Sequence, residues 1–535
     1  MASSTFKRGR FGFWAKAVAA LLLIALGDRL FWVEEQYGST FGAFAAAWLI
    51  GTVAVHPALR HDRRALVAAA LAALYAAALF DDPGLLAALL FGAALVMAVL
   101  LPRSKRFDNA WRWAMRLVIH AVVSGFGPLL DLGKLRRVPR NGRSVRASVP
   151  VLALPLIGGG IFLALFARAN PLIGNALAAL AFPTPNEKTI QRLFLWTVLF
   201  VVAWSTLRPR RPRWLTLAGP TADPKALPGV SVASVTLSLI VFNALFALQN
   251  ALDLAFLWSG AGLPDGVTMA QYVHQGAYPL IATALLAGLF VLVVLRPGSA
   301  TSDAPLIRRL VTLWVAQNIF LVASSMLRTL DYIDAYSLTR LRIAALAWMG
   351  LVAVGLMLIL WRMLRAKSAS WLINANAATA GIVLTACTIV DLGSVAATWN
   401  VHHAREVGGR GAALDLCYLE RLGPSALIAL VELEQRKLTP TFRRRVAVSR
   451  SGVLDALRSD QEHGGWTWRN ARRLDGAVQI GGIRVVGERI SSEFDCTGSP
   501  VEYPKIITDT RPAQPAPPPP PPAPPAAPLT KAPQR

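Results

Sequence analysis

Long apolar blocks recur along most of this chain and decide what it can fold into. Between Trp14 and Asp391, runs of mainly apolar residues alternate with short polar or arginine-rich connections. Each run has the length of a helix that crosses the hydrocarbon of a bilayer, which takes roughly 17 to 25 residues. A soluble core does not need so many blocks of this length. We therefore expect an all-α protein, a polytopic transmembrane helix bundle.

The blocks predict about eleven spans. Their expected positions are residues 13–33, 41–58, 64–80, 84–101, 148–168, 190–207, 230–257, 275–295, 309–327, 341–361 and 371–391. A cleavable signal peptide is the alternative for the first block, because basic residues from Lys7 to Lys16 precede its apolar run. The run continues to Trp32 without a small-residue cleavage site, so we interpret it as a retained span.

The connections alternate in charge, and this alternation predicts orientation. The net charge is +25, and basic residues gather at the N-terminus and near 60–64, 103–146, 208–213, 296–309 and 362–367. Connections such as EEQYG and FDDPG carry none. Because basic short loops stay in the cytoplasm, we expect a cytoplasmic N-terminus and, after eleven crossings, an extracytoplasmic C-terminus. Basic residues spread in this way indicate topology, so no nucleic-acid partner is predicted.

One apolar block, at residues 117–132, does not fit the alternation. Arginine-rich sequence flanks it on both sides, so a crossing would place one of these basic clusters outside. We expect an interfacial or re-entrant segment on the cytoplasmic face, and a true span is the alternative.

The chain divides into four expected regions. Residues 1–146 hold spans one to four and the basic interfacial segment, 147–398 the remaining bundle, 399–510 an extracytoplasmic polar domain, and 511–535 a disordered Pro-rich tail. The polar domain is predicted to be α+β, because LDLCYLERLGPSALIALVELEQRKL has helical periodicity and GAVQIGGIRVVGERI looks extended. It contains Cys417 and Cys496, which an oxidising compartment could pair.

Polar residues inside or beside the spans form the candidate site. In the span 230–257, Asn243, Asn250 and Asp253 share one helical face. An ionisable group in hydrocarbon must face the bundle interior, water or the outer interface. Two roles stay open for this face: hydrogen bonding to another helix, or a ligand or proton site. The candidate residues are Asn250, Asp253, His274, Arg328, Asp331, Asp334 and Arg340.

The last four of these residues belong to RTLDYIDAYSLTRLR, between the predicted spans nine and ten. Asp/Arg pairs there could neutralise one another at the interface, with the tyrosines in an aromatic belt. The alternative is an outward pocket for a lipid head group, glycan or peptide, with arginines as anion ligands.

Motifs for catalysis or cofactor binding are missing from the sequence. His402 and Glu406 have helical i, i+4 spacing but lack a third ligand for a metal. We find no P-loop, Rossmann glycine fingerprint, GxSxG or usable HExxH. We therefore predict no catalytic residue, no metal and no cofactor.

Five strings between about residues 240 and 430 resemble a bacterial family, the domain-of-unknown-function family DUF 4173, also catalogued with DUF 4153. They are LQNALDLAFLW, LPDGVTMAQYVHQGAYPLIATALL, MLRTLDYIDAYSLTRLRIAALAWM, the segment from Asp391 to NVHHA, and LDLCYLERLGPSAL. One departure is Val273–His274, where the family has an alanine followed by arginine or histidine. The resemblance implies a multi-pass protein of the bacterial inner membrane without an assigned activity.

Three function classes follow. The first is a non-enzymatic envelope protein for signalling, assembly or partner binding, whose C-terminal domain and Pro-rich tail engage a periplasmic or wall-associated protein. The second is a transporter or a lipid- or glycan-handling protein that uses an outward polar site. The third is a membrane transferase, for which Asp253, Asp331 or Asp334 would have to supply an essential carboxylate. In all three the lipid bilayer is the first partner.

Overall fold

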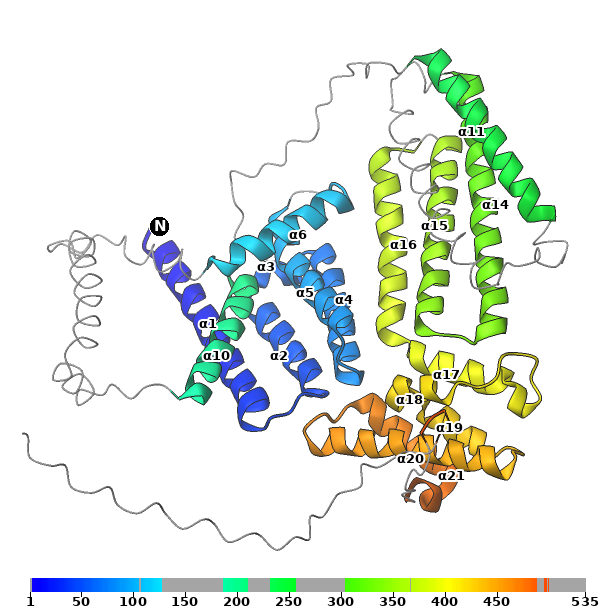
Figure 1. Ribbon diagram of the computed structural model, residues 1–535. Helices are drawn as coiled ribbons and strands as arrows, with labels where there is room; N and C mark the ends of the chain where they lie inside the picture. Colours follow the sequence, from blue (N-terminus) through cyan, green and yellow to red (C-terminus); the bar gives the residue numbers. More distant parts are fainter. Residues whose placement is uncertain are drawn as a thin grey trace, which may run out of the picture.

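The computed structural model describes residues 2–104, 107–127, 186–209, 231–255, 304–365, 367–487, 495–497 and 499. These residues are helical and contain no strand. They form an N-terminal bundle, a central bundle and a C-terminal domain (Figure 1). The predicted spans 148–168 and 275–295 and the Pro-rich tail lie outside the described residues.

The N-terminal bundle holds the first four predicted spans and the sixth. Its elements are α1 (Ala2–Asp28) with a π-helical turn (Arg29–Val33), α2 (Thr40–Val55), α3 (Pro57–His61), α4 (Arg63–Asp81), α5 (Leu85–Leu100), α6 (Ala110–Gly125) and α10 (Glu187–Leu207). Asp62 begins α4 by accepting the backbone N–H of Arg64 at 2.8 Å. Alanines such as Ala65, Ala72 and Ala98 are fully buried between these helices, where small side chains let helix backbones approach closely.

The central bundle consists of α11 (Val232–Asp253), α14 (Pro305–Tyr336), α15 (Arg340–Leu364) and α16 (Ala369–Ile389). An apolar core that includes Leu239, Val311 and Met349 joins its helices. Helix α16 also contacts the N-terminal bundle: the hydroxyl oxygens of Tyr75 and Thr385 lie 2.8 Å apart. The two bundles therefore meet along α16.

The described helices confirm the membrane-protein prediction. Seven of them are long and apolar enough to cross a bilayer, and α2 is a shorter apolar helix. Every predicted span within the described residues coincides with a helix. The chain is therefore a multi-pass membrane protein, and the total of about eleven spans remains a prediction.

Helix α6 covers the described part of the ambiguous block at 117–132. It has 16 residues, and its two faces differ in burial. Trp113 and His120 on one face are buried, whereas Trp111, Val118 and Val122 are exposed. Figure 1 shows α6 inclined to the neighbouring helices. This amphipathic helix fits the interfacial interpretation.

The C-terminal domain is helical in its described residues, so the predicted α+β domain is wrong for them. It comprises α17 (Leu392–His403), α18 (Leu416–Leu422), α19 (Leu427–Glu434), α20 (Pro440–Glu462) and α21 (Trp468–Gly487). The stretch predicted to be extended, GAVQIGGIRVVG, belongs to α21. There Leu474, Ala477 and Val478 pack on the domain core at helical spacing. This packing outweighs the low helix propensity of the glycines and valines.

The structure joins Cys417 to Cys496 in a disulfide that links positions 79 residues apart. Arg445 supports this link by donating to the carbonyl oxygen of Cys496 at 2.9 Å. The disulfide holds residues 495–497 against α18.

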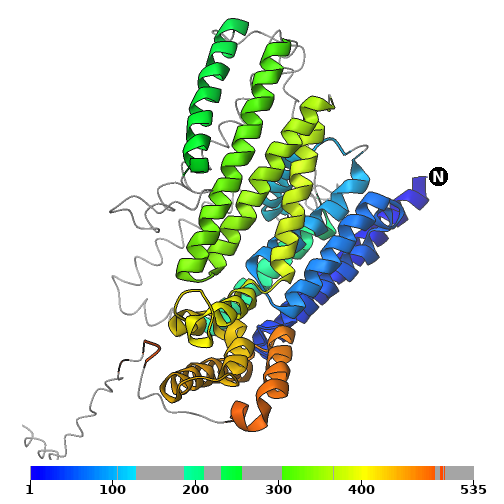
Figure 2. The same cartoon turned by 90° about the vertical axis from the view of Figure 1, so that its right-hand side faces the viewer.

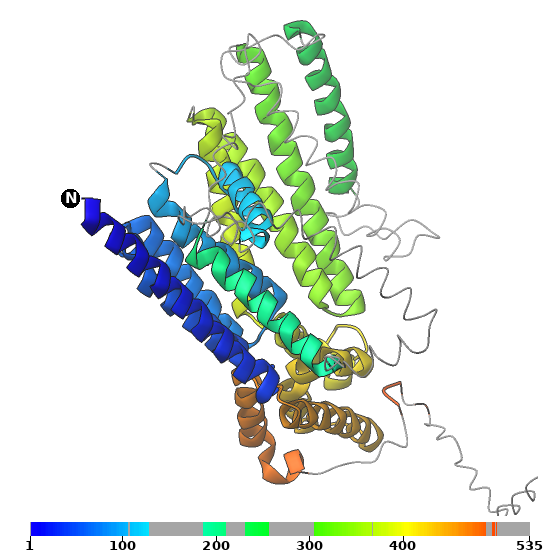
Figure 3. The same ribbon diagram turned by 90° about the vertical axis from the view of Figure 1, so that its left-hand side faces the viewer.

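The C-terminal domain covers one end of both bundles, which we call the docked end (Figure 2). The connections 34–39, 82–84 and 337–339 lie at this end, and the arginine-rich connections 56–62 and 365–368 lie at the other. Figure 3 shows α1 and α10 side by side, and Arg192 donates to Asp28 at 2.8 Å between them. The structure thus separates the two kinds of connection along the helix axes.

Candidate functional site

The polar face of α11 packs against α14. The Asn243 side-chain amide donates to the carbonyl oxygen of Leu310 at 3.1 Å and accepts from Gln317 at 2.9 Å. About two helical turns further on, Asn250 donates to the carbonyl oxygen of Gln317 at 3.3 Å. The shared face predicted for these residues therefore forms a ladder of hydrogen bonds that sets the register of the two helices.

Asp253 completes the ladder with a buried ion pair to Arg328 of α14. The two side chains are 2% and 7% exposed. Gln249 donates to the same carboxylate oxygen, Oδ1, at 2.9 Å. The other oxygen, Oδ2, is buried and accepts no hydrogen bond from the described residues.

The register of α11 and α14 locates Asp253 along the length of α14. The hydrogen bonds of Asn243 and Asn250 offset α11 from α14 by a constant 67 residues. The same offset places Asp253 level with Phe320, near the middle of the 32-residue α14. Arg328 lies two turns nearer the docked end and reaches back to the carboxylate. The ion pair thus joins the end of α11 to the half of α14 that is nearer the docked end.

The candidate residues in the last turns of α14 and at the start of α15 point to different partners in the described structure. Arg328 turns inward to Asp253, and Arg340 donates to Ser425 of the C-terminal domain at 3.1 Å. Asp331 and Asp334 are exposed. Arg342 donates to the carbonyl oxygen of Tyr336 at 2.6 Å and closes the end of α14. His274 lies outside the described residues.

A second polar cluster forms where α16 meets α17 at the docked end. Asp391 begins α17 by accepting the backbone N–H groups of Gly393 and Ser394, each at 3.1 Å. Its carboxylate also accepts from the Ser425 hydroxyl at 3.0 Å and pairs with Arg473 of α21. One carboxylate therefore connects the central bundle with two helices of the C-terminal domain.

Burial and charge act in opposite directions on Asp391. Burial by itself raises the pKa of this carboxyl, but the hydrogen bond and charge of Arg473 outweigh it, so the pKa lies below its ordinary value. Gly393 leaves room for the cluster, since a Cβ atom there would lie 2.3 Å from a guanidinium nitrogen of Arg340. Asp391 is therefore held in its charged form.

Three arginines of α21, which we call the arginine clamp, attach the C-terminal domain to both bundles. Arg469 donates to Asp81 at 2.7 Å and to Asp82 at 3.0 Å, and Arg472 also pairs with Asp81. Arg473 binds Asp391. The side chains of Arg469 and Arg473 are each only 11% exposed. Arg469 and Arg472 bind the end of α4, and Arg469 also donates to the carbonyl oxygen of Ile389, the last residue of α16, at 3.1 Å. The clamp therefore contacts both bundles.

Backbone hydrogen bonds reinforce the clamp. The N–H of Tyr37 donates to the carbonyl oxygen of Gly464 at 2.8 Å, and the N–H of Ser39 donates to that of Trp466, also at 2.8 Å. These bonds join the α1–α2 connection to the α20–α21 connection. The C-terminal domain is thus docked by main chain as well as by charge.

One known protein family matches most of the chain. Residues 65–433 match the family described as domain of unknown function (DUF4153). The chain belongs to this family. The matched region begins in the first turn of α4 and ends in the last turn of α19, so it includes the Asp253–Arg328 pair and Asp391. The arginine clamp lies beyond it. No curated protein and no solved structure matches the chain.

The structure of this DUF4153 protein gives the His402/Glu406 pair local roles. His402 Nδ1 lies 2.8 Å from the carbonyl oxygen of Thr398, and Glu406 accepts the backbone N–H of Leu414 at 3.1 Å. Within the described ranges, no three His, Cys, Asp or Glu side chains come together at metal-binding distances. His402 thus contacts its own helix, α17, whereas Glu406 holds the connection that follows it.

The arginine clamp and its acidic partners were not predicted from the sequence, although the sequence contains the pattern. In WRNARR, three arginines lie on one helical face: Arg469, Arg472 and Arg473. In FDDPG, Asp81 and Asp82 belong to a connection without basic residues. Pairing an arginine face of the C-terminal domain with acidic connections predicted on the same side would have found it.

Proposed function

We propose that this DUF4153 protein is an inner-membrane protein of the bacterial envelope that works by binding a partner, with a cytoplasmic N-terminus and an extracytoplasmic C-terminal domain. Two observations support this orientation. The arginine-rich connections lie at the end opposite the docked domain, as expected for cytoplasmic loops. The docked domain carries the Cys417–Cys496 disulfide, and such bonds persist in oxidising compartments.

The docking of the C-terminal domain is the observation that carries the binding role. The arginine clamp and the Asp391 cluster use polar groups at the docked end to fix this domain in one orientation. A domain held in this way presents a constant surface. The Pro-rich sequence 511–535 follows it, and about 20 residues of polyproline helix reach roughly 60 Å. We infer that the tail is a docking strand for a periplasmic or wall-associated protein.

A second candidate is ion or proton transport through the α11–α14 interface. The burial of the Asp253–Arg328 pair favours it, as do buried acceptor oxygens on Asn250, Gln317 and Asp253 that receive no hydrogen bond from the described residues. Acceptor-rich groups inside the apolar layer are typical of cation or proton pathways.

Complementation of a deletion strain separates the two candidates. One variant lacks residues 511–535, a second replaces them with a Gly/Ser segment of equal length, and a third carries Asp253→Asn. For a partner-binding protein, both tail variants reach the membrane at wild-type level but fail to complement, because a Pro-rich segment has no core to lose. Asp253→Asn complements.

The opposite pattern would support transport. If Asp253→Asn accumulates normally but fails to complement while both tail variants succeed, the binding role of the tail is wrong. If the Gly/Ser variant restores function, the tail is a spacer, and the proposed docking strand is excluded.

A further inference from the structure

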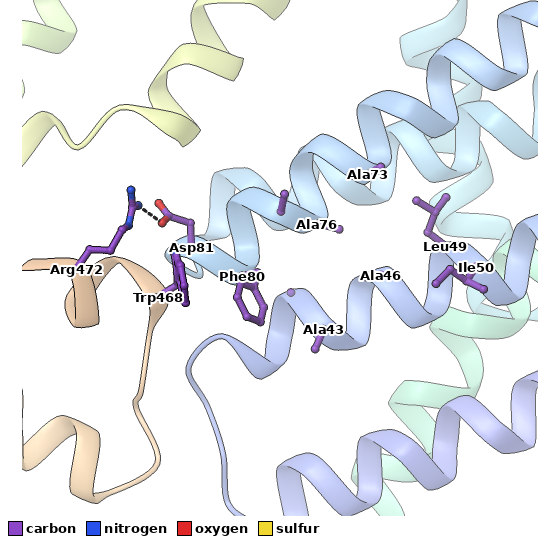
Figure 4. A pocket seen from close by; sticks show the side chains of 12 residues that line it. Ala43, Ala46, Leu49, Ile50, Ala73, Ala76, Phe80, Asp81, Trp468 and Arg472 are labelled. Carbon is purple, nitrogen blue, oxygen red and sulfur yellow. Dashed lines mark hydrogen bonds and ion pairs between the residues drawn. The ribbon is translucent and has the colours of Figure 1, made fainter.

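A groove runs along α2 and α4 and ends at the C-terminal domain (Figure 4). Its volume is about 820 Å³, within the roughly 300–1,000 Å³ typical of small-molecule sites. Apolar residues form most of its wall: Gly42, Ala43, Ala46, Leu49, Ile50, Ala73, Ala76, Ala77 and Phe80. We call it the alanine groove.

Close helix packing shapes the docked end of the alanine groove. At Gly42 the two backbones approach so closely that a Cβ atom would lie 2.2 Å from the backbone nitrogen of Phe80. From Gly42 to Ile50 the groove follows nine residues of α2, a rise of about 12 Å. Alanines of both helices line this space (Figure 4). A long apolar chain fits such a shape.

The rim of the groove is charged and aromatic. Asp81, Trp468 and Arg472 stand at its docked end (Figure 4). Arg472 pairs with Asp81, yet its side chain is 59% exposed, and Asp81 is also held by Arg469. Trp468 is 48% exposed and lies beside Phe80, with ring centroids 6.4 Å apart. Tryptophan with this setting is typical of the membrane–water interface.

We propose that the alanine groove binds one phospholipid with a zwitterionic phosphoethanolamine head group, with Arg472 holding the phosphate and the acyl chain lying along α2 and α4. The rim carries both charges side by side, which complements a phosphate next to an ammonium. Arginine is suited to phosphate because its guanidinium offers several N–H donors in one plane. Because Trp468 and Arg472 belong to the C-terminal domain, the bound lipid lies between that domain and the bundle. The site is independent of the binding role proposed for the tail.

Photo-crosslinking of the full-length protein in vesicles tests the site. The probe is phosphatidylethanolamine with a photoreactive group on one acyl chain, and labelled peptides are mapped by mass spectrometry. Label is expected in residues 42–50 and 73–81. Ala77→Phe fills the groove and should lower this label at least about fivefold. Ala70→Phe is the matched control, because Ala70 is exposed on the same helix but does not line the groove.

The head-group contact needs its own comparison. Arg472→Gln should lower labelling at the same peptides, whereas Arg421→Gln, at an arginine that is 73% exposed elsewhere on the domain, should not. Unlabelled phosphatidylethanolamine should compete better than phosphatidylglycerol, which lacks the ammonium. Even labelling of all membrane-facing helices, unchanged labelling of Ala77→Phe, or equal competition by both lipids would each overturn the proposal.

Discussion

Substitutions of the Asp253–Arg328 ion pair are the most informative test of what stabilises the central bundle. Both side chains are almost fully buried, so removing one partner leaves an uncompensated charge. Breaking a buried pair in this way typically costs about 3–5 kcal/mol, whereas replacing both partners with apolar residues is often neutral. Comparing single with double substitutions of this pair therefore distinguishes a role in packing from a requirement for the charges.

We expect Asp253→Leu to lower the thermal stability of the purified protein in detergent strongly, by about 3–5 kcal/mol in the free energy of unfolding. Asp253→Asn should be milder, since the amide still accepts a hydrogen bond from Arg328. The double variant Asp253→Leu/Arg328→Met should recover most of the loss. Melting curves of the four proteins measure this. A double variant no more stable than Asp253→Leu would show that the arginine has further essential contacts.

A pH dependence is expected from Asp391. Because the folded pKa of this carboxyl lies below its ordinary value, its contribution to stability is present above about pH 3.9 and is lost as the pH falls through the lowered pKa. Melting temperatures between pH 3 and 7 should therefore fall at the acidic end. Asp391→Asn should be less stable at pH 7 and should flatten this part of the profile.

Asp475→Asn is the control for this experiment, because Asp475 is exposed on α21, the same helix as Arg473. Its profile should follow the wild type. An acidic loss of equal size in Asp391→Asn would show that other carboxyls cause it.

At the residue level, periodicity predicted the face that Asn243, Asn250 and Asp253 share, because one helix is enough to define a face. The partner of Asp253 could not be predicted from one helix alone. Arg328 is 75 residues away in sequence and pairs through the register of two helices, which is set by the hydrogen-bond ladder between them. Arg328 was instead grouped with the residues next to it in the chain.

At the level of elements, the apolar blocks were enough to find the helices, since a span depends mainly on its own length and composition. Helix α21 shows where local sequence fails. Glycines and valines in GAVQIGGIRVVG suggest an extended segment, but the helix gains the burial of Ala477 on α19 and α20 and the ion pairs of the arginine clamp. Both gains come from contacts with distant segments.

The same difference explains the docked end. In the sequence alone, three aspartates are simply residues at the ends of helices: Asp81, Asp82 and Asp391. They anchor the C-terminal domain because α21 brings three arginines to them and because Ser425 also donates to Asp391. A set of connections expected on one side of the membrane was therefore predictable, and the domain that covers them was not.

For the whole molecule, the separation of connections along the helix axes leads to a topology prediction. Phosphatase fused after Arg405 should be active, because that position lies in the docked domain, and phosphatase fused after Arg365 should be inactive, because that position lies at the arginine-rich end.

The disulfide provides an independent test of the same orientation, since Cys417 and Cys496 pair only where the compartment is oxidising. Non-reducing gels of the protein from intact cells, with free thiols blocked at lysis, should show a faster band that Cys496→Ser abolishes. Cys387→Ser is the control, because Cys387 is a free thiol in α16 and its loss should leave the band unchanged. Active fusions at both positions, or a protein that is fully reduced in cells, would contradict an extracytoplasmic C-terminal domain and with it the proposed binding of a periplasmic partner.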